Sequence, residues 1–178
     1  MATFVIPDPS LVVLVGAAGS GKTTLAARVF APDEIVSSDA LRRAVSGDEA
    51  DQRVSAVAFR ILHRMVQRRL AQGRLTVVDA TNTSAVARRP LIVRARAAGL
   101  PAPAIVLDLT ADAIRSQNAG RERVVDPEII DRHLEAIRRT VDGGRLAVEG
   151  FDPVIVLRSP LETAALVVER RLMPLPRR

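Results

Sequence analysis

Residues 16–23 read Gly-Ala-Ala-Gly-Ser-Gly-Lys-Thr and match the full pattern G-x-x-x-x-G-K-[ST]. Glycines in such a loop let backbone N–H groups face phosphate oxygens, and the next helix adds its positive dipole end. This pattern predicts a P-loop that binds ATP and Mg²⁺, with a chance glycine turn as the alternative. The expected nucleotide contacts come from seven residues of this stretch: Gly16, Gly19, Ser20, Gly21, Lys22, Thr23 and Thr24.

Lys22 and Thr23 carry the most specific chemistry of the loop. The lysine is expected to reach the β- and γ-phosphates, and the threonine hydroxyl is expected to bind magnesium. Lys22 is also the only lysine among 26 basic residues, and it stands where a compact ammonium is needed.

Several P-loop chemistries can be separated on sequence. A guanine reader of the N-K-x-D type needs a second lysine, which the chain lacks. A hydrolysing ATPase usually has a Glu after the acid that ends an apolar strand, but Asp79 is followed by Ala80. A kinase is therefore the class that remains.

A second candidate group follows the strand that we expect at residues 34–37. Asp39 is expected near the carboxyl edge of a sheet, where ligands of α/β proteins bind. Its carboxylate could accept a proton from an attacking hydroxyl or hold magnesium. Arg42, one helical turn later, could bind an acceptor phosphate. The alternatives are a helix N-cap for Asp39 and a plain surface charge for Arg42.

Apolar segments of strand length alternate with helical patterns, which predicts an α/β domain with a parallel sheet. The expected strands are 11–15, 34–37, 75–79, 104–109 and 154–157. The expected helices are 22–30, 51–72, 84–98, 111–119, 127–141 and 161–168, with Asp126 as an N-cap and Pro127 first in its helix. We expect a single domain over residues 1–172, with a lid at about 115–127 and a flexible tail at 173–178.

Composition further limits the location and the ligands expected for the protein. No apolar run approaches the roughly 18 residues that a membrane span needs, and the chain has no cysteine. A cytoplasmic protein without a membrane partner is expected. The net charge of +6 suits anionic ligands, while four Phe with no Tyr or Trp argue against a long platform of stacked bases.

The ordered motifs resemble the kinase module of bacterial polynucleotide kinase-phosphatases, a group of P-loop 5′-hydroxyl kinases. The resemblance runs from about Val12 to Glu169. It rests on Gly-Ser-Gly-Lys-Thr at 19–23, Ser-Ser-Asp at 37–39 with Arg42, Asp51-Gln52, Leu-Thr-Val-Val-Asp-Ala-Thr-Asn at 75–82, Arg-Pro-Leu-Ile at 89–92, Arg-His at 132–133 and Glu-Gly-Phe at 149–151.

This resemblance implies a nucleoside-monophosphate-kinase-like fold with five parallel strands in the order 2-3-1-4-5 and a helical lid. It implies that Asp39 is the general base for a 5′-hydroxyl and that Arg42 lies near the acceptor. It places Gln52 as an acceptor contact, or else an ordinary first-turn residue. Asp79 would support magnesium, or simply order the Thr81-Asn82 turn.

The lid departs from the family pattern. Relatives enter the lid as Arg-Asn with another Arg three residues later, whereas this chain has Gln117 at the first position. Arg121 fits the second position and is expected to act in catalysis and in nucleotide binding. Arg123 adds a further cation, and Arg115 falls on the wrong face of the helix.

The resemblance implies transfer of the γ-phosphate of ATP to the 5′-hydroxyl end of DNA or RNA. A kinase of sugars, antibiotics or nucleotide-sugars is the first alternative, and a nucleotide-binding protein without catalysis, suggested by Gln117, is the second. Four arginines form a stripe along the helix expected at 51–72: Arg53, Arg60, Arg64 and Arg68. This stripe is either a solvated face or a contact for a polynucleotide backbone. His63 and His133 are interpreted as structural.

Overall fold

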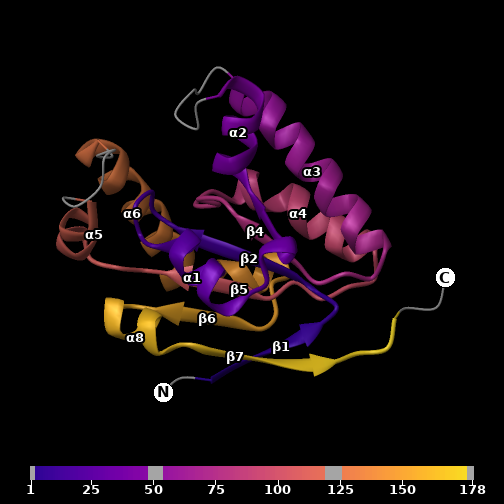
Figure 1. The fold of residues 1–178 in the computed structure, drawn as a ribbon. Helices are drawn as coiled ribbons and strands as arrows, with labels where there is room; N and C mark the ends of the chain where they lie inside the picture. The colour runs from indigo at the N-terminus through magenta and orange to yellow at the C-terminus, as the bar shows by residue number, and fades with distance from the viewer. Residues whose placement is uncertain (1–2, 48–53, 119–125, 176–178) are drawn as a thin grey trace.

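A five-stranded parallel sheet forms the centre of the protein (Figure 1). The computed structural model describes residues 3–47, 54–118 and 126–175. The sheet order is β3-β4-β2-β5-β6, which confirms the predicted order 2-3-1-4-5. Its strands are β2 (Leu11–Gly16), β3 (Ile35–Ser37), β4 (Thr76–Asp79), β5 (Ala104–Leu107) and β6 (Val154–Leu157).

The central strand β2 is buried along its whole length. It pairs with β4 on one side, with Val13 opposite Val78, and with β5 on the other, with Val15 opposite Val106. Because helices cover both faces of such a sheet, its strands are continuous apolar runs rather than alternating ones. This explains why these five strands could be recognised in the sequence.

The helices are α1 (Lys22–Val29), α2 (Ser38–Ser46), α3 (Ser55–Ala71), α4 (Ala85–Ala97), α5 (Ala111–Asn118), α6 (Pro127–Asp142), α7 (Arg145–Glu149) and α8 (Pro160–Ala165), with a 3₁₀ turn at Pro32–Glu34. Asp126 caps α6 as predicted, because its carboxylate accepts the Glu128 N–H at 2.9 Å. The short helices α2 and α7 were not among the expected helices. No helix in the described residues combines the length and apolar character that crossing a bilayer requires.

Two strands outside the main sheet were missed from the sequence. β1 (Thr3–Asp8) and β7 (Val167–Leu172) form a separate parallel pair beside β6 (Figure 1). The helix expected at 161–168 is therefore wrong beyond Ala165, where α8 ends. In β1, Phe4 and Ile6 are buried on either side of the exposed Val5, so one face of this pair packs on the core.

A buried ion pair supports the loop that follows β4. The Arg88 side chain, 1% exposed, donates to both carboxylate oxygens of Glu149 at 2.7 and 2.6 Å. It also donates to the carbonyls of Asn82 and Thr83, each at 2.9 Å. One guanidinium thus ties α4 and α7 to the loop that leaves the carboxyl end of β4.

Glu149→Ala should lower the free energy of unfolding by about 3 kcal/mol, because it leaves the Arg88 charge buried without its partner. Urea unfolding followed by circular dichroism measures this change. The matched control is Glu135→Ala, which removes an exposed Glu–Arg pair on α6 that should be worth about 1 kcal/mol or less. Equal losses in the two variants would contradict the supporting role of the buried pair.

Candidate functional site

The P-loop connects the end of β2 to the start of α1, as the motif predicts. Gly19 and Gly21 have positive φ values of 82° and 89°, which side chains other than glycine rarely adopt. A Cβ at Gly16 would lie 2.7 Å from Ser20 Oγ, so a side chain there would collide with the loop itself. The glycines of the motif are therefore required by the shape of the loop.

Two polar side chains are buried inside the P-loop, residues 16–23, which we call the phosphate cradle. Lys22 is 7% exposed, and its Nζ donates to the carbonyls of Gly16 at 3.0 Å and Ala17 at 2.7 Å. Ser20 is 1% exposed, and its Oγ has no hydrogen-bond partner among the described residues. A buried hydroxyl without a partner is costly, so this donor and the lysine ammonium suit an anionic phosphate group.

Thr23 and Asp79 meet at the carboxyl edge of the sheet. The Thr23 hydroxyl donates to Asp79 Oδ2 at 2.8 Å, and Asp79 is 4% exposed. Burial raises the pKa of Asp79, against the lowering effect of the Thr23 hydrogen bond and the Lys22 charge. One carboxylate beside one hydroxyl fits Mg²⁺, which is usually bound by one or two carboxylates together with phosphates and waters.

The turn after Asp79 is ordered by another residue. Asn82 has a positive φ of 47°, and its Nδ2 donates to the carbonyl of Leu14 at 2.8 Å. The Thr81 carbonyl accepts the N–H of Gly16, the first residue of the P-loop, at 3.0 Å. These bonds attach the turn after β4 to β2. They do not involve the Asp79 carboxylate, which accepts the hydrogen bond from Thr23.

Asp39 lies in the first turn of α2, two residues after β3 ends. Ser37, not Asp39, caps this helix, because its hydroxyl accepts the Ala40 N–H. The Asp39 side chain is 55% exposed, and its charge contributes to the raised pKa of Asp79, which places the two carboxylates near each other. Arg42 forms an ion pair with Asp39 Oδ1, so the structure brings both predicted residues together.

Helix α5 approaches the P-loop through Gln117. An ideal Cβ on Gly21 would lie 3.8 Å from Gln117 Oε1. Arg115 instead forms an ion pair with Asp131 of α6 at 3.1 Å. This agrees with the expectation that Arg115 lies on a different face of the helix from Gln117 and does not replace the first lid arginine of the family. The predicted site residues Gln52, Arg121 and Arg123 lie outside the described residues.

His133 is a P-loop contact that the sequence interpretation missed. Its Nδ1 accepts the backbone N–H of Ala18, inside the motif, at 3.3 Å. Burial lowers the pKa of His133, and the charges of Lys22 and Arg132 lower it further. The imidazole therefore favours its neutral form, which is the form that can accept a hydrogen bond at Nδ1. The one sequence signal for this role is that His133 belongs to the Arg-His pair at 132–133, which is among the motifs shared with the resembled family.

The contact between His133 and Ala18 should be sensitive to pH. Because the folded pKa lies below the unfolded value near 6.5, protonation destabilises the folded state as the pH falls below about 6.5. The hydrogen-exchange protection of the Ala18 amide should fall as the His133 ring of the folded protein is protonated, at a pH below about 6.5, since protonated Nδ1 cannot accept. His133→Asn keeps an acceptor without a titrating ring, so its protection should stay constant.

His63→Asn is the matched control for this measurement. The pKa of His63 is also lowered, first by burial and then by Arg94, but His63 lies on α3, away from Ala18 in sequence. This variant should keep the pH-dependent protection of Ala18. Protection in the parent that stays constant down to the pH at which an NMR titration shows the His133 ring to be protonated would exclude the proposed coupling.

The comparisons with known proteins agree with this geometry. A family model described as an AAA domain matches residues 11–143, which include the P-loop, both candidate carboxylates and His133. No curated protein sequence matches the chain. Many solved structures share the fold.

Three solved structures illustrate the range of similar proteins. A chain of the Pnkp1/Rnl/Hen1 RNA repair complex has 20% identity and a TM-score of 0.67, with 78% of this chain and 47% of that chain covered. Kti12 of Chaetomium thermophilum, in complex with ADP-AlF3, has 19% identity, a TM-score of 0.63 and coverages of 86% and 93%. A gluconokinase from Sinorhizobium meliloti 1021 has 16% identity, a TM-score of 0.56 and coverages of 90% and 92%.

These similarities show the fold, since each identity is below a quarter, and this chain spans about half the length of the RNA repair protein. The family match covers most of the chain and includes the whole phosphate-binding motif. With its parallel sheet and its P-loop, the chain therefore belongs to this AAA domain family and has a P-loop kinase-like fold.

Proposed function

We propose that this protein is a phosphotransferase that moves the γ-phosphate of ATP to a hydroxyl group, and that its acceptor is the 5′-hydroxyl end of DNA or RNA. The observation that carries the proposal is the position of Asp39. Its carboxylate is half exposed and lies near the buried Asp79, which accepts a hydrogen bond from Thr23 of the P-loop. An acceptor hydroxyl at Asp39 would be close to a nucleotide in the P-loop.

Different residues of the site are proposed to bind the phosphates and the magnesium ion. In the proposal, Lys22 leaves its two carbonyl partners for the β- and γ-phosphates, and Ser20 Oγ donates to a phosphate oxygen. Thr23 and Asp79 would hold magnesium. Bound magnesium would neutralise charge that develops on the phosphate oxygens during transfer.

The reaction needs one proton acceptor and an aligned attack. Asp39 accepts the proton of the acceptor hydroxyl as its oxygen bonds to the γ-phosphorus. The bond from this phosphorus to the β–γ bridging oxygen breaks, and ADP leaves with the electron pair. Arg42, which is paired with Asp39, orients that carboxylate and would contact an acceptor phosphate.

Two similar structures support different acceptors. The RNA repair complex supports a nucleic-acid end, as do the motifs shared with 5′-hydroxyl kinases. The gluconokinase supports the second candidate, a small-molecule kinase, because it matches this chain over nearly its whole length. The site chemistry is the same in both cases, and a transfer assay distinguishes the two acceptors.

Transfer from γ-labelled ATP to 5′-hydroxyl oligonucleotides, compared with sugars, tests the proposal. We expect label on the oligonucleotide, and label only on a sugar would favour the second candidate. Asp39→Asn should retain ATP binding but lower transfer at least about a hundredfold, because it removes the proton acceptor. Lys22→Ala is the contrasting control, since it should lose ATP binding as well. Transfer by Asp39→Asn near the parental rate would refute the assigned base.

Gln117 gives a second test of the site. Its amide approaches Gly21, so Gln117→Arg should place a cation over the phosphates and raise turnover or tighten ATP binding. Ser116→Arg adds the same charge on an exposed neighbouring position and should have no such effect. If the two variants behave alike, α5 does not face the bound phosphates. We propose that Arg121 and Arg123 supply the remaining lid cations, with Gln52 on the acceptor side.

A further inference from the structure

The positive charge of the protein is concentrated in one segment. Residues 55–97 contain nine arginines and a single acidic residue, Asp79, and therefore carry a net charge of +8. The whole chain carries +6, so all its other residues together sum to −2. Helices α3 and α4, which belong to this segment, contain no acidic residue.

Some of these arginines have structural partners. Arg88 pairs with Glu149, Arg69 donates to the Leu75 carbonyl at 3.1 Å, and Arg94 donates to the His63 carbonyl at 3.2 Å. Arg74 forms an ion pair with Asp33. These interactions hold α3, α4 and the sheet together, and they account for part of the excess charge.

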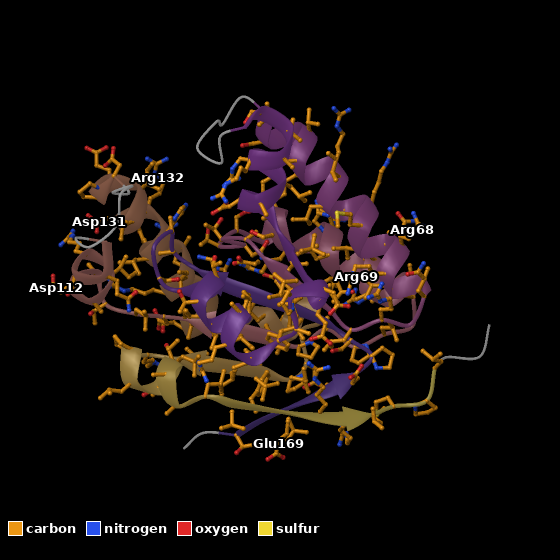
Figure 2. All side chains as sticks on the ribbon, in the orientation of Figure 1. Arg68, Arg69, Asp112, Asp131, Arg132 and Glu169 are labelled. Atoms are coloured by element: carbon orange, nitrogen blue, oxygen red, sulfur yellow. The ribbon has the colours of Figure 1, made fainter. Side chains whose placement is uncertain are left out.

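Three arginines on α3 have no such role. The side chains of Arg60, Arg64 and Arg68 are exposed and make no hydrogen bond or ion pair within the described part of the chain. They follow one another at i, i+4 spacing, about 6 Å apart along the helix axis, where like charges repel. Figure 2 shows Arg68 on the outer side of the molecule, far from Asp131 and Arg132 of α6. Three unpaired cations on one face therefore lack a partner within the described protein, and an anionic ligand could supply it.

We propose that this α3 stripe, defined as Arg60, Arg64 and Arg68, binds the sugar-phosphate backbone of a nucleic-acid strand. The inference rests on the proposed function, because the strand would be the acceptor whose 5′ end lies at Asp39. Helix α2, which carries Asp39, packs against α3. A strand that leaves the site across α2 would meet α3, the helix that carries the stripe.

The chemistry of the stripe favours phosphate groups. Guanidinium groups bind phosphates through two parallel N–H donors, and regular cations without acids among them suit a polymer of regular anions. A membrane surface would also need exposed apolar side chains to insert. On α3 the one large apolar side chain that is clearly exposed is Met65, at 39%. The partner is therefore held by charge and not by apolar burial.

The test is the salt dependence of binding to a single-stranded 5′-hydroxyl oligonucleotide of about 16 nucleotides, measured by fluorescence anisotropy. Each phosphate contact to a single strand contributes about 0.7 to the slope of log affinity against log salt concentration. The variant Arg60→Gln/Arg64→Gln/Arg68→Gln should therefore lower the slope by about 2. Its KM for this acceptor should rise, whereas its KM for a nucleoside 3′-monophosphate should not change.

The matched control removes the same charge elsewhere, as Arg138→Gln/Arg145→Gln/Arg171→Gln, at three exposed positions outside α3 and α4. This control should keep the parental slope. Equal slopes in both triple variants would overturn the proposal, as would loss of binding to phosphatidylserine vesicles without loss of oligonucleotide binding. Binding is measured without turnover, so a change of slope supports the stripe even if no oligonucleotide is phosphorylated, which would refute the proposed function alone.

Discussion

The pairing of β2 with β4 is the constraint on which the candidate site depends. The two strands run parallel, so the P-loop after β2 and Asp79 at the end of β4 meet at one edge of the sheet. The hydrogen bond from Thr23 to Asp79 spans 56 residues of sequence and exists because of this register. β3 pairs next to β4, with Ser37 opposite Asp79, and so brings α2 and Asp39 to the same edge.

Burial determines which partners the polar side chains of the site need. Lys22, Ser20 and Asp79 are all nearly inaccessible, so each needs a partner of suitable charge or hydrogen-bonding type. The protein provides carbonyls for the lysine and a hydroxyl for the aspartate, while the serine hydroxyl has no partner among the described residues. The surrounding loops are fixed by Asn82, Arg88 and Glu149, which contribute no group to the cradle itself.

The sequence predicted the parts of the protein that depend on local pattern. The five strands of the main sheet, their order through the family resemblance, and the P-loop are confirmed, because apolar runs and glycine spacing are visible in the chain. The β1–β7 pair was missed, since Phe4 and Ile6 carry only a short alternation and β7 is mostly exposed. Long-range contacts left no local pattern: nothing in the spacing indicates that His133 meets Ala18 or that Arg88 meets Glu149.

A crystal structure with magnesium and a non-hydrolysable ATP analogue tests the central claim most directly. We expect Lys22 Nζ to exchange the carbonyls of Gly16 and Ala17 for phosphate oxygens, and Thr23 Oγ1 to bind the metal with Asp79 beside it. The Asp39 carboxylate should then face the γ-phosphate. An analogue bound away from residues 16–23, or one whose γ-phosphate is out of reach of Asp39, would contradict the proposed phosphotransferase site.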